Sequence, residues 1–175
     1  MLPDKCQNVF KQWLGQYDNL IFKIVRAYAD SPADQDDLFQ EILMQLWSSI
    51  PGFQAKASET TWIYRVALNT ALVWTRSKTR RRRRHLALIT DFSRQSDIQQ
   101  NCSEALPRQE IIDQLYAAIY KLPKIDGSLI LMHLDGLTYQ QMAEVLGISA
   151  SNIAVKLNRA KKQLAQLLKG LIDDI

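Results

Sequence analysis

The feature that most constrains this 175-residue chain is a helical repeat that is interrupted once near its C-terminal end. Apolar residues recur at helical spacing from Thr138 to Leu146, the pattern breaks at residues 147–149, and it resumes through Lys162. Thr138 is a suitable N-cap, and Gly147 tolerates the left-handed conformation that ends many helices. The pattern predicts two short helices around a tight turn, which is the helix-turn-helix arrangement.

The second of these helices has two distinct faces. Its apolar residues recur at steps of three and four and are expected to be buried: Ile153, Leu157, Ala160 and Leu164. The opposite stripe combines an amide, an apolar side chain and two cations: Asn152, Val155, Lys156 and Arg159. Such groups contact base edges, thymine methyl groups and phosphates, so the stripe indicates binding to duplex DNA. A helical hairpin with a solvated basic face is the alternative.

A second polyanion signal lies in the first half of the chain. Residues 76–85 contain seven Lys or Arg and no acid, which exceeds the net charge of +4 for the whole chain. They end a helix expected from Glu59 to about Arg80, which interleaves aromatic, cationic and amide side chains: Trp62, Tyr64, Arg65, Asn69 and Arg76. Bases stack on rings while cations follow the backbone, so this pattern favours single-stranded nucleic acid. The alternative is that the tryptophans belong only to the core.

An acidic edge begins the helix expected from Pro32 to about Ser49. It contains four carboxylates within eight residues: Asp34, Asp36, Asp37 and Glu41. The helix dipole explains one or two of them, because it favours anions in the first turn. The rest indicate a basic protein partner. Convergent metal ligands and a catalytic group are not found in the sequence, so no metal, cofactor or enzymatic activity is expected.

Composition is that of an ordinary globular protein, with 47% hydrophobic and 23% charged residues. No apolar run approaches the roughly 20 residues that span a bilayer, and the N-terminus has no signal layout. A cytoplasmic protein without membrane insertion is therefore expected. Cys6 and Cys102 lie far apart, and neither a disulfide framework nor a zinc site is indicated.

The periodicity predicts an all-α protein of two small helical bundles joined by a flexible linker. Residues 1–85 form an N-terminal bundle of three helices, the first of them at 9–29. Residues 86–108 form the linker, with a short helix near 86–89, and residues 109–175 form the bundle that contains the helix-turn-helix. Two further helices are expected in this second bundle, at about Arg108–Leu122 and Asp126–Leu134.

Three segments of the chain resemble bacterial RNA polymerase sigma factors of the extracytoplasmic-function (ECF) type. DQDDLFQEILMQLW at 34–47 is similar to the core-binding helix of that family, and SETTWIYRVALNTALVWTR at 58–76 to its promoter-melting helix. The residues from Leu122 to Leu164 resemble its second DNA-binding domain. The chain departs from the family pattern at five positions: Leu68, Val73, Gly127, Gln141 and Ala154. Gly127 replaces a common arginine, and Gln141 replaces the usual glutamate.

The resemblance implies a dissociable, non-catalytic subunit that directs core RNA polymerase to promoter DNA and assists strand opening. The residues that would bind core polymerase are Asp34, Asp37, Gln40 and Glu41. The melted strand would be held by Phe53, Trp62, Tyr64, Arg65, Asn69, Arg76, Arg80 and Arg81. The upstream promoter element would be read by Asn152, Val155, Lys156 and Arg159. An anti-sigma factor is a further implied partner.

Two other functions are compatible with parts of the sequence. A polymerase-independent helix-turn-helix regulator would explain the C-terminal pattern, but it would not need the arrangement from Trp62 to Arg84. A protein-interaction adaptor that grips a basic coiled coil would explain the acidic edge, but not the polar stripe of the second helix-turn-helix helix.

Overall fold

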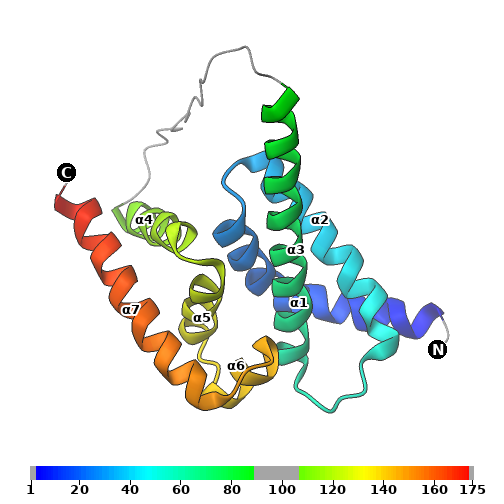
Figure 1. The fold of residues 1–175 in the computed structure, drawn as a ribbon. Helices are drawn as coiled ribbons and strands as arrows, with labels where there is room; N and C mark the ends of the chain where they lie inside the picture. Colours follow the sequence, from blue (N-terminus) through cyan, green and yellow to red (C-terminus); the bar gives the residue numbers. More distant parts are fainter. Residues whose placement is uncertain (1–2, 89–106, 174–175) are drawn as a thin grey trace.

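The computed structural model describes residues 3–88 and 107–173, and every regular element in these two ranges is helical. The elements follow in chain order (Figure 1): α1 Pro3–Tyr28, α2 Pro32–Ser49, a 3-10 turn η1 Ile50–Gly52, α3 Glu59–Leu88, α4 Pro107–Lys121, α5 Lys124–Leu134, α6 Tyr139–Leu146 and α7 Ala150–Asp173. The prediction of an all-α protein is confirmed.

Helices α1 to α3 form the first lobe. Leu38, Ile42 and Leu46 are buried on one side of α2, as their spacing of four residues predicts. The facing helix α3 buries Ala67 and Ala71, whose small side chains let two helices approach closely. This tight pair leaves the outer faces of α2 and α3 available to partners.

Helices α4 to α7 form the second lobe, whose core is made of Leu129, Leu131, Met142, Ile153 and Leu157 among others. Here α5 lies very close to α4. A Cβ atom at Gly127 would lie 3.3 Å from the backbone oxygen of Ile119 and 3.4 Å from its side chain. The close approach gives a physical reason for glycine at 127.

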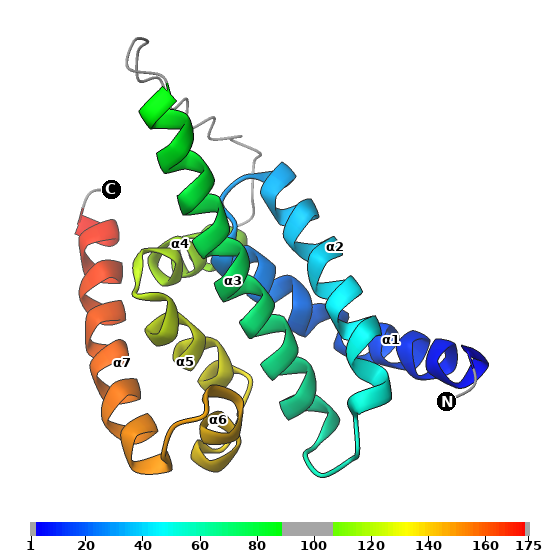
Figure 2. The ribbon, with the colours of Figure 1, turned by 45° about the vertical axis from the view of Figure 1, so that its right-hand side comes forward.

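The two lobes are packed against each other. Helix α1 contacts α4 and α5, and α3 contacts α6, so that one buried cluster runs through both lobes. Figures 1 and 2 both show α5 between α7 and α3. At the junction the buried Tyr28 hydroxyl donates to the backbone oxygen of Lys124 at 2.8 Å and is also hydrogen-bonded to Ser128, while Arg26 pairs with Asp113.

Several helices are longer than the sequence pattern predicts. Helix α3 continues to Leu88 through the arginine run, because arginine is a good helix former even where no apolar stripe exists. The expected linker at 86–108 therefore begins within α3 and ends within α4. Its residues 89–106, with Cys102, lie outside the described residues. Helix α1 begins before residue 9, and α7 extends beyond Lys162.

The buried Tyr28 at the junction should make the free energy of unfolding depend on pH at the alkaline end. Burial raises the pKa of Tyr28 from its ordinary value of 10.0 to about 12, an effect that the hydrogen bond with Ser128 partly offsets. Because the unfolded chain loses this proton first, the free energy of unfolding should fall as pH rises from about 10 to about 12.

Tyr28→Phe should make this fall less steep and should also lower stability near neutral pH by about 1 kcal/mol, since it removes the hydroxyl. Thermal unfolding followed by circular dichroism across this pH range measures both effects. Tyr139→Phe, at an exposed tyrosine of α6, is the matched control. A Tyr28→Phe curve that is parallel to the wild-type curve would contradict the prediction.

Candidate nucleic-acid interface

The connection between α2 and α3 builds a small pocket. After η1 the chain turns through Ala55, whose φ of 54° is unusual for a residue with a side chain. Ser58 then caps α3 by accepting a hydrogen bond from the Thr61 amide at 3.2 Å. The turn holds the loop against the first turns of α3, and backbone outliers of this kind often accompany functional loops.

The pocket has aromatic walls and a cationic rim, and its volume is about 250 Å³. The rings of Phe53 and Trp62 lie 5.6 Å apart, and the Arg65 guanidinium lies 4.8 Å from the Trp62 ring. The indole of Trp62 donates to Ser49 at 3.1 Å, which fixes the ring. Two predicted strand-binding aromatics and one cation thus meet in one pocket, which a stacked base could enter.

A polar stripe continues from this pocket along the outer face of α3. Arg65, Asn69 and Arg76 follow Trp62 at helical steps, and the last two are exposed. Asn69 lies beside a neighbouring hollow between α2 and α3. The backbone of Arg80 and Arg81 continues the helix, while their side chains are outside the described set.

Tyr64 behaves differently from the other residues predicted to hold the strand. It lies on the opposite face of α3 and is 0% exposed. Its hydroxyl donates to Asp135, at the C-terminal end of α5 in the second lobe, and Asp135 also pairs with Lys23 of α1. Burial raises the pKa of Tyr64, and the bond to Asp135 raises it further. Tyr64 therefore reaches no ligand in this conformation.

The acidic edge of α2 divides into two sets. Asp37 and Gln40 are exposed on the outer face, beside the apolar side chains of Met44 and Trp47. Phe22 of α1 is exposed as well and stacks on Phe39 of α2 at 4.7 Å. The spacing of the sequence places Met44 and Trp47 at the edges of the buried stripe, and the structure exposes both of them. Periodicity within α2 gives no signal for Phe22, which belongs to another helix.

A further acid of the edge, Asp36, is exposed. The remaining two acids have partners within the first lobe. Asp34 forms hydrogen bonds with the capping Ser31 and pairs with Lys78 of α3, while Glu41 accepts a hydrogen bond from Gln45 at 3.0 Å. Burial alone would lower the pKa of Lys78, but its hydrogen bonds to Asp34 and Asp30 raise it. Only Asp37 and Gln40 of the four predicted residues are therefore both exposed and without such a bond.

The helix-turn-helix has the predicted local chemistry. Thr138 accepts from the Gln141 amide at 3.2 Å, and the Gln141 side chain accepts from the Thr138 amide at 2.8 Å, which completes a capping box. Gly147 ends α6 with φ of 67°, in the left-handed region. Ser149 accepts from the Asn152 amide at 3.3 Å and so caps α7.

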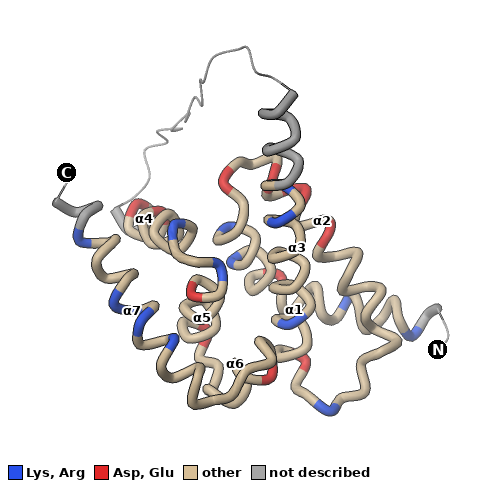
Figure 3. The backbone as a smooth tube through the Cα atoms, viewed as in Figure 1, with Lys and Arg blue, Asp and Glu red and all other residues tan. Residues whose placement is uncertain are grey.

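The predicted reading face of α7 is exposed as one stripe. Ile153 and Leu157 are buried on the other side of the helix, as predicted. The exposed residues are Asn152, Val155, Lys156 and Arg159, and Val155 is 71% exposed. Figure 3 shows that Lys and Arg positions, coloured blue, are distributed along α7.

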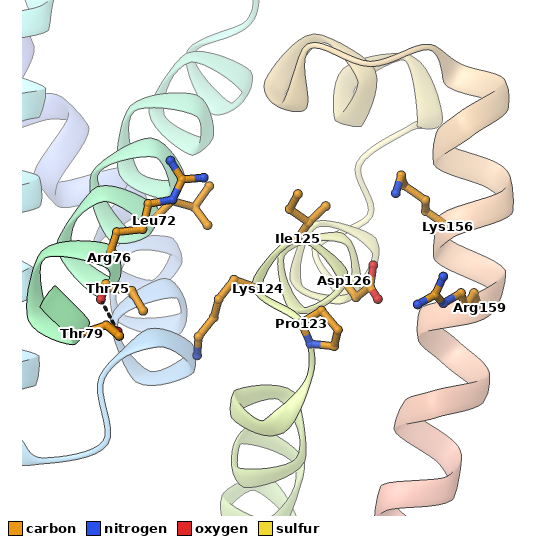
Figure 4. Close-up of a pocket in the computed structure, with 10 residues that line it drawn as sticks. All are labelled: Leu72, Thr75, Arg76, Thr79, Pro123, Lys124, Ile125, Asp126, Lys156 and Arg159. Carbon is orange, nitrogen blue, oxygen red and sulfur yellow. Dashed lines mark hydrogen bonds between the residues drawn. The ribbon is translucent and has the colours of Figure 1, made fainter. Parts of the chain in front are cut away.

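A groove of about 580 Å³ lies between the two lobes. Figure 4 shows that Arg76 of α3 lines it from one side, and Lys156 and Arg159 of α7 from the other, with Lys124 and Asp126 of α5 between them. Cations from both predicted nucleic-acid surfaces therefore face the same groove. Burial lowers the pKa of Lys124.

In the described part of the chain, no three His, Cys, Asp or Glu side chains are grouped as metal ligands. Within the same ranges, no helix is both long enough and apolar enough to span a membrane.

The comparisons with known proteins agree with this geometry. Residues 13–81 match the family described as Sigma-70 region 2, and residues 112–164 match Sigma-70, region 4. The ECF RNA polymerase sigma-E factor of Haemophilus influenzae is 23% identical over 95% of this chain and 90% of its own length. The ECF RNA polymerase sigma factor SigX of Bacillus subtilis is 29% identical over 96% of this chain and 90% of its own.

Two solved structures share the fold. CnrH, solved in complex with the cytosolic domain of CnrY, has a TM-score of 0.66 and 19% identity over 94% of this chain and 90% of its own. RpoE of Bartonella quintana, solved with the anti-sigma factor NepR, has a TM-score of 0.66 and 22% identity over 91% of this chain and 96% of its own. With both sigma-70 regions in order and ECF sigma factors matching along nearly its whole length, this chain belongs to the ECF sigma factor family.

Proposed function

We propose that this chain is a dissociable, non-catalytic promoter-specificity subunit that binds core RNA polymerase in the cytoplasm and recognises promoter DNA with both lobes. The observation that carries this proposal is the aromatic pocket formed by Phe53, Trp62 and Arg65, from which the polar stripe of α3 continues. A regulator that reads only duplex DNA has no use for a pocket of this kind.

Strand opening follows from the chemistry of the pocket. A base that leaves the duplex loses stacking and pairing worth a few kcal/mol. Stacking on Trp62, with Phe53 as the second wall, returns about 1–3 kcal/mol, and Arg65 and Arg76 attract the adjacent phosphates. The protein thereby favours the open state of the promoter, while nucleotide addition belongs to the polymerase.

The remaining surfaces have separate roles. Asp37 and Gln40, with Met44 and Trp47 beside them, offer a face that is both acidic and apolar, which suits a basic helical segment of core polymerase. Asp34 and Glu41 would support this face from behind. The α7 stripe would read the upstream element in the major groove. An anti-sigma partner is proposed by analogy with RpoE, which was solved with NepR.

Run-off transcription with core polymerase tests the proposal as a whole. Supplying the chain should give transcripts from new start sites on genomic fragments, and Asp37→Lys should abolish both these transcripts and co-purification with core polymerase. The reversed charge would repel a basic partner while the exposed position preserves the fold. Glu144→Lys, the same charge change at an exposed acid of α6, is the control. Start sites that do not depend on the chain would refute the proposed function.

Trp62→Ala should weaken strand opening more than it weakens duplex binding, because only the melted strand uses the pocket. The expected loss in open complex is about tenfold, the equivalent of one stacked base. Permanganate footprinting measures opening, and Trp62→Phe, which keeps an aromatic ring, should retain most of it. A footprint of Trp62→Ala that equals the wild-type footprint would remove the pocket from the mechanism.

Arg159→Ala should lower affinity for the promoter fragments recovered by run-off transcription several-fold, since it removes a cation from the reading face. Lys161→Ala is the matched control. It removes an equal charge from an exposed position two residues away, which a helix places on another face. Gel-shift assays at fixed salt compare the two variants, and equal losses would show that α7 contributes only a diffuse charge.

A further inference from the structure

Asp135 occupies an unusual position between the lobes. It belongs to the second lobe, at the end of α5, and its carboxylate side chain is only 14% exposed. Both side chains that satisfy it come from the first lobe, since Tyr64 of α3 donates a hydrogen bond and Lys23 of α1 forms an ion pair. A carboxylate that is mostly removed from water is costly without such partners. The side chain of Asp135 is therefore suited to joining the two lobes, since its partners Tyr64 and Lys23 both belong to the first lobe.

The joined state leaves too little room for a duplex at surfaces that the proposed function needs. Helix α6, the first helix of the helix-turn-helix, is packed against α3, whereas in this motif the first helix crosses the DNA backbone. Lys156 and Arg159 border a groove whose volume of about 580 Å³ suits a small ligand and cannot admit a duplex. Closure therefore competes with docking of the second lobe on DNA.

Repulsion between the cations that line the groove opposes closure. Arg76 faces Lys124, Lys156 and Arg159 across the groove, and Asp126 is the only acid among the groove residues. Like charges that face each other across a groove repel each other. The shared apolar cluster and a few polar contacts offset this repulsion. Among the polar contacts, the bonds to Asp135 are the ones that involve a nearly buried charge.

We propose that Asp135 is a latch that holds the lobes in a closed state of low affinity for promoter duplex, and that its release from Tyr64 and Lys23 opens the protein for binding. By linkage, a partner that binds only the open state must itself weaken the latch. The claim of closure stands on the contacts above, and its effect on DNA binding rests on the proposed function.

The test uses the full chain with Asp135→Ala and a matched control, Glu144→Ala. Both substitutions remove one negative charge from the second lobe, but Glu144 is exposed on α6 and takes no part in the bonds between Asp135, Tyr64 and Lys23. Small-angle X-ray scattering should show a larger radius of gyration for Asp135→Ala than for wild type, and no change for Glu144→Ala. Equal scattering from the two variants would overturn the latch.

The second measurement is affinity for a short random-sequence duplex at low salt. Asp135→Ala should bind it several-fold more tightly than Glu144→Ala does, because the shared charge change cancels in this comparison. Expansion without this difference would overturn the link between closure and DNA binding. If wild type and variants bind neither duplex nor core polymerase, the proposed function fails while scattering still decides whether the latch exists.

A milder variant protects the test against loss of folding. Tyr64→Phe removes one hydroxyl and keeps the buried ring, so it should give an intermediate expansion and an intermediate gain in affinity. If Asp135→Ala is unfolded by circular dichroism, Tyr64→Phe decides the question. A Tyr64→Phe protein with wild-type scattering and wild-type affinity would then overturn the latch.

Discussion

The close contact of α2 with α3 is the constraint on which the rest of this structure depends. Helix α2 buries Leu38, Ile42 and Leu46, helix α3 buries the small residues Ala67 and Ala71, and the two helices are in close contact. The pair can therefore be thin, and each helix retains an outer face. One face carries the acidic and apolar edge, and the other carries the aromatic pocket and its cations. The proposed function assigns a different partner to each of these faces.

The local structure of the second lobe is determined more by helix capping and backbone conformation than by charged side chains. Its helix-turn-helix is fixed by a capping box at Thr138 and by the left-handed Gly147, with the apolar side of α7 beneath. Such local signals can be read from a sequence, because each involves residues three or four apart. The four residues of α7 that are proposed to read DNA were predicted in this way, and the structure exposes all of them together.

Contacts between segments far apart in the chain could not be predicted from the sequence. Periodicity shows that Tyr64 and Trp62 lie on different faces of α3, but it does not show that Asp135, more than seventy residues away, covers one of them. Asp34 likewise looked like part of a free acidic face until Lys78 was found beside it. Helix ends were missed where arginines continue a helix without an apolar stripe, as at the end of α3.

The amide of Gln141 affects how the N-terminal cap of α6 in the second lobe depends on pH and on nearby charge. A glutamate at this position would close the same ring of hydrogen bonds, but its cap would weaken on protonation and would place an anion near a polyanionic ligand. The amide does neither, because it carries no charge and does not titrate. The start of α6 is therefore held equally well in mild acid and beside phosphate.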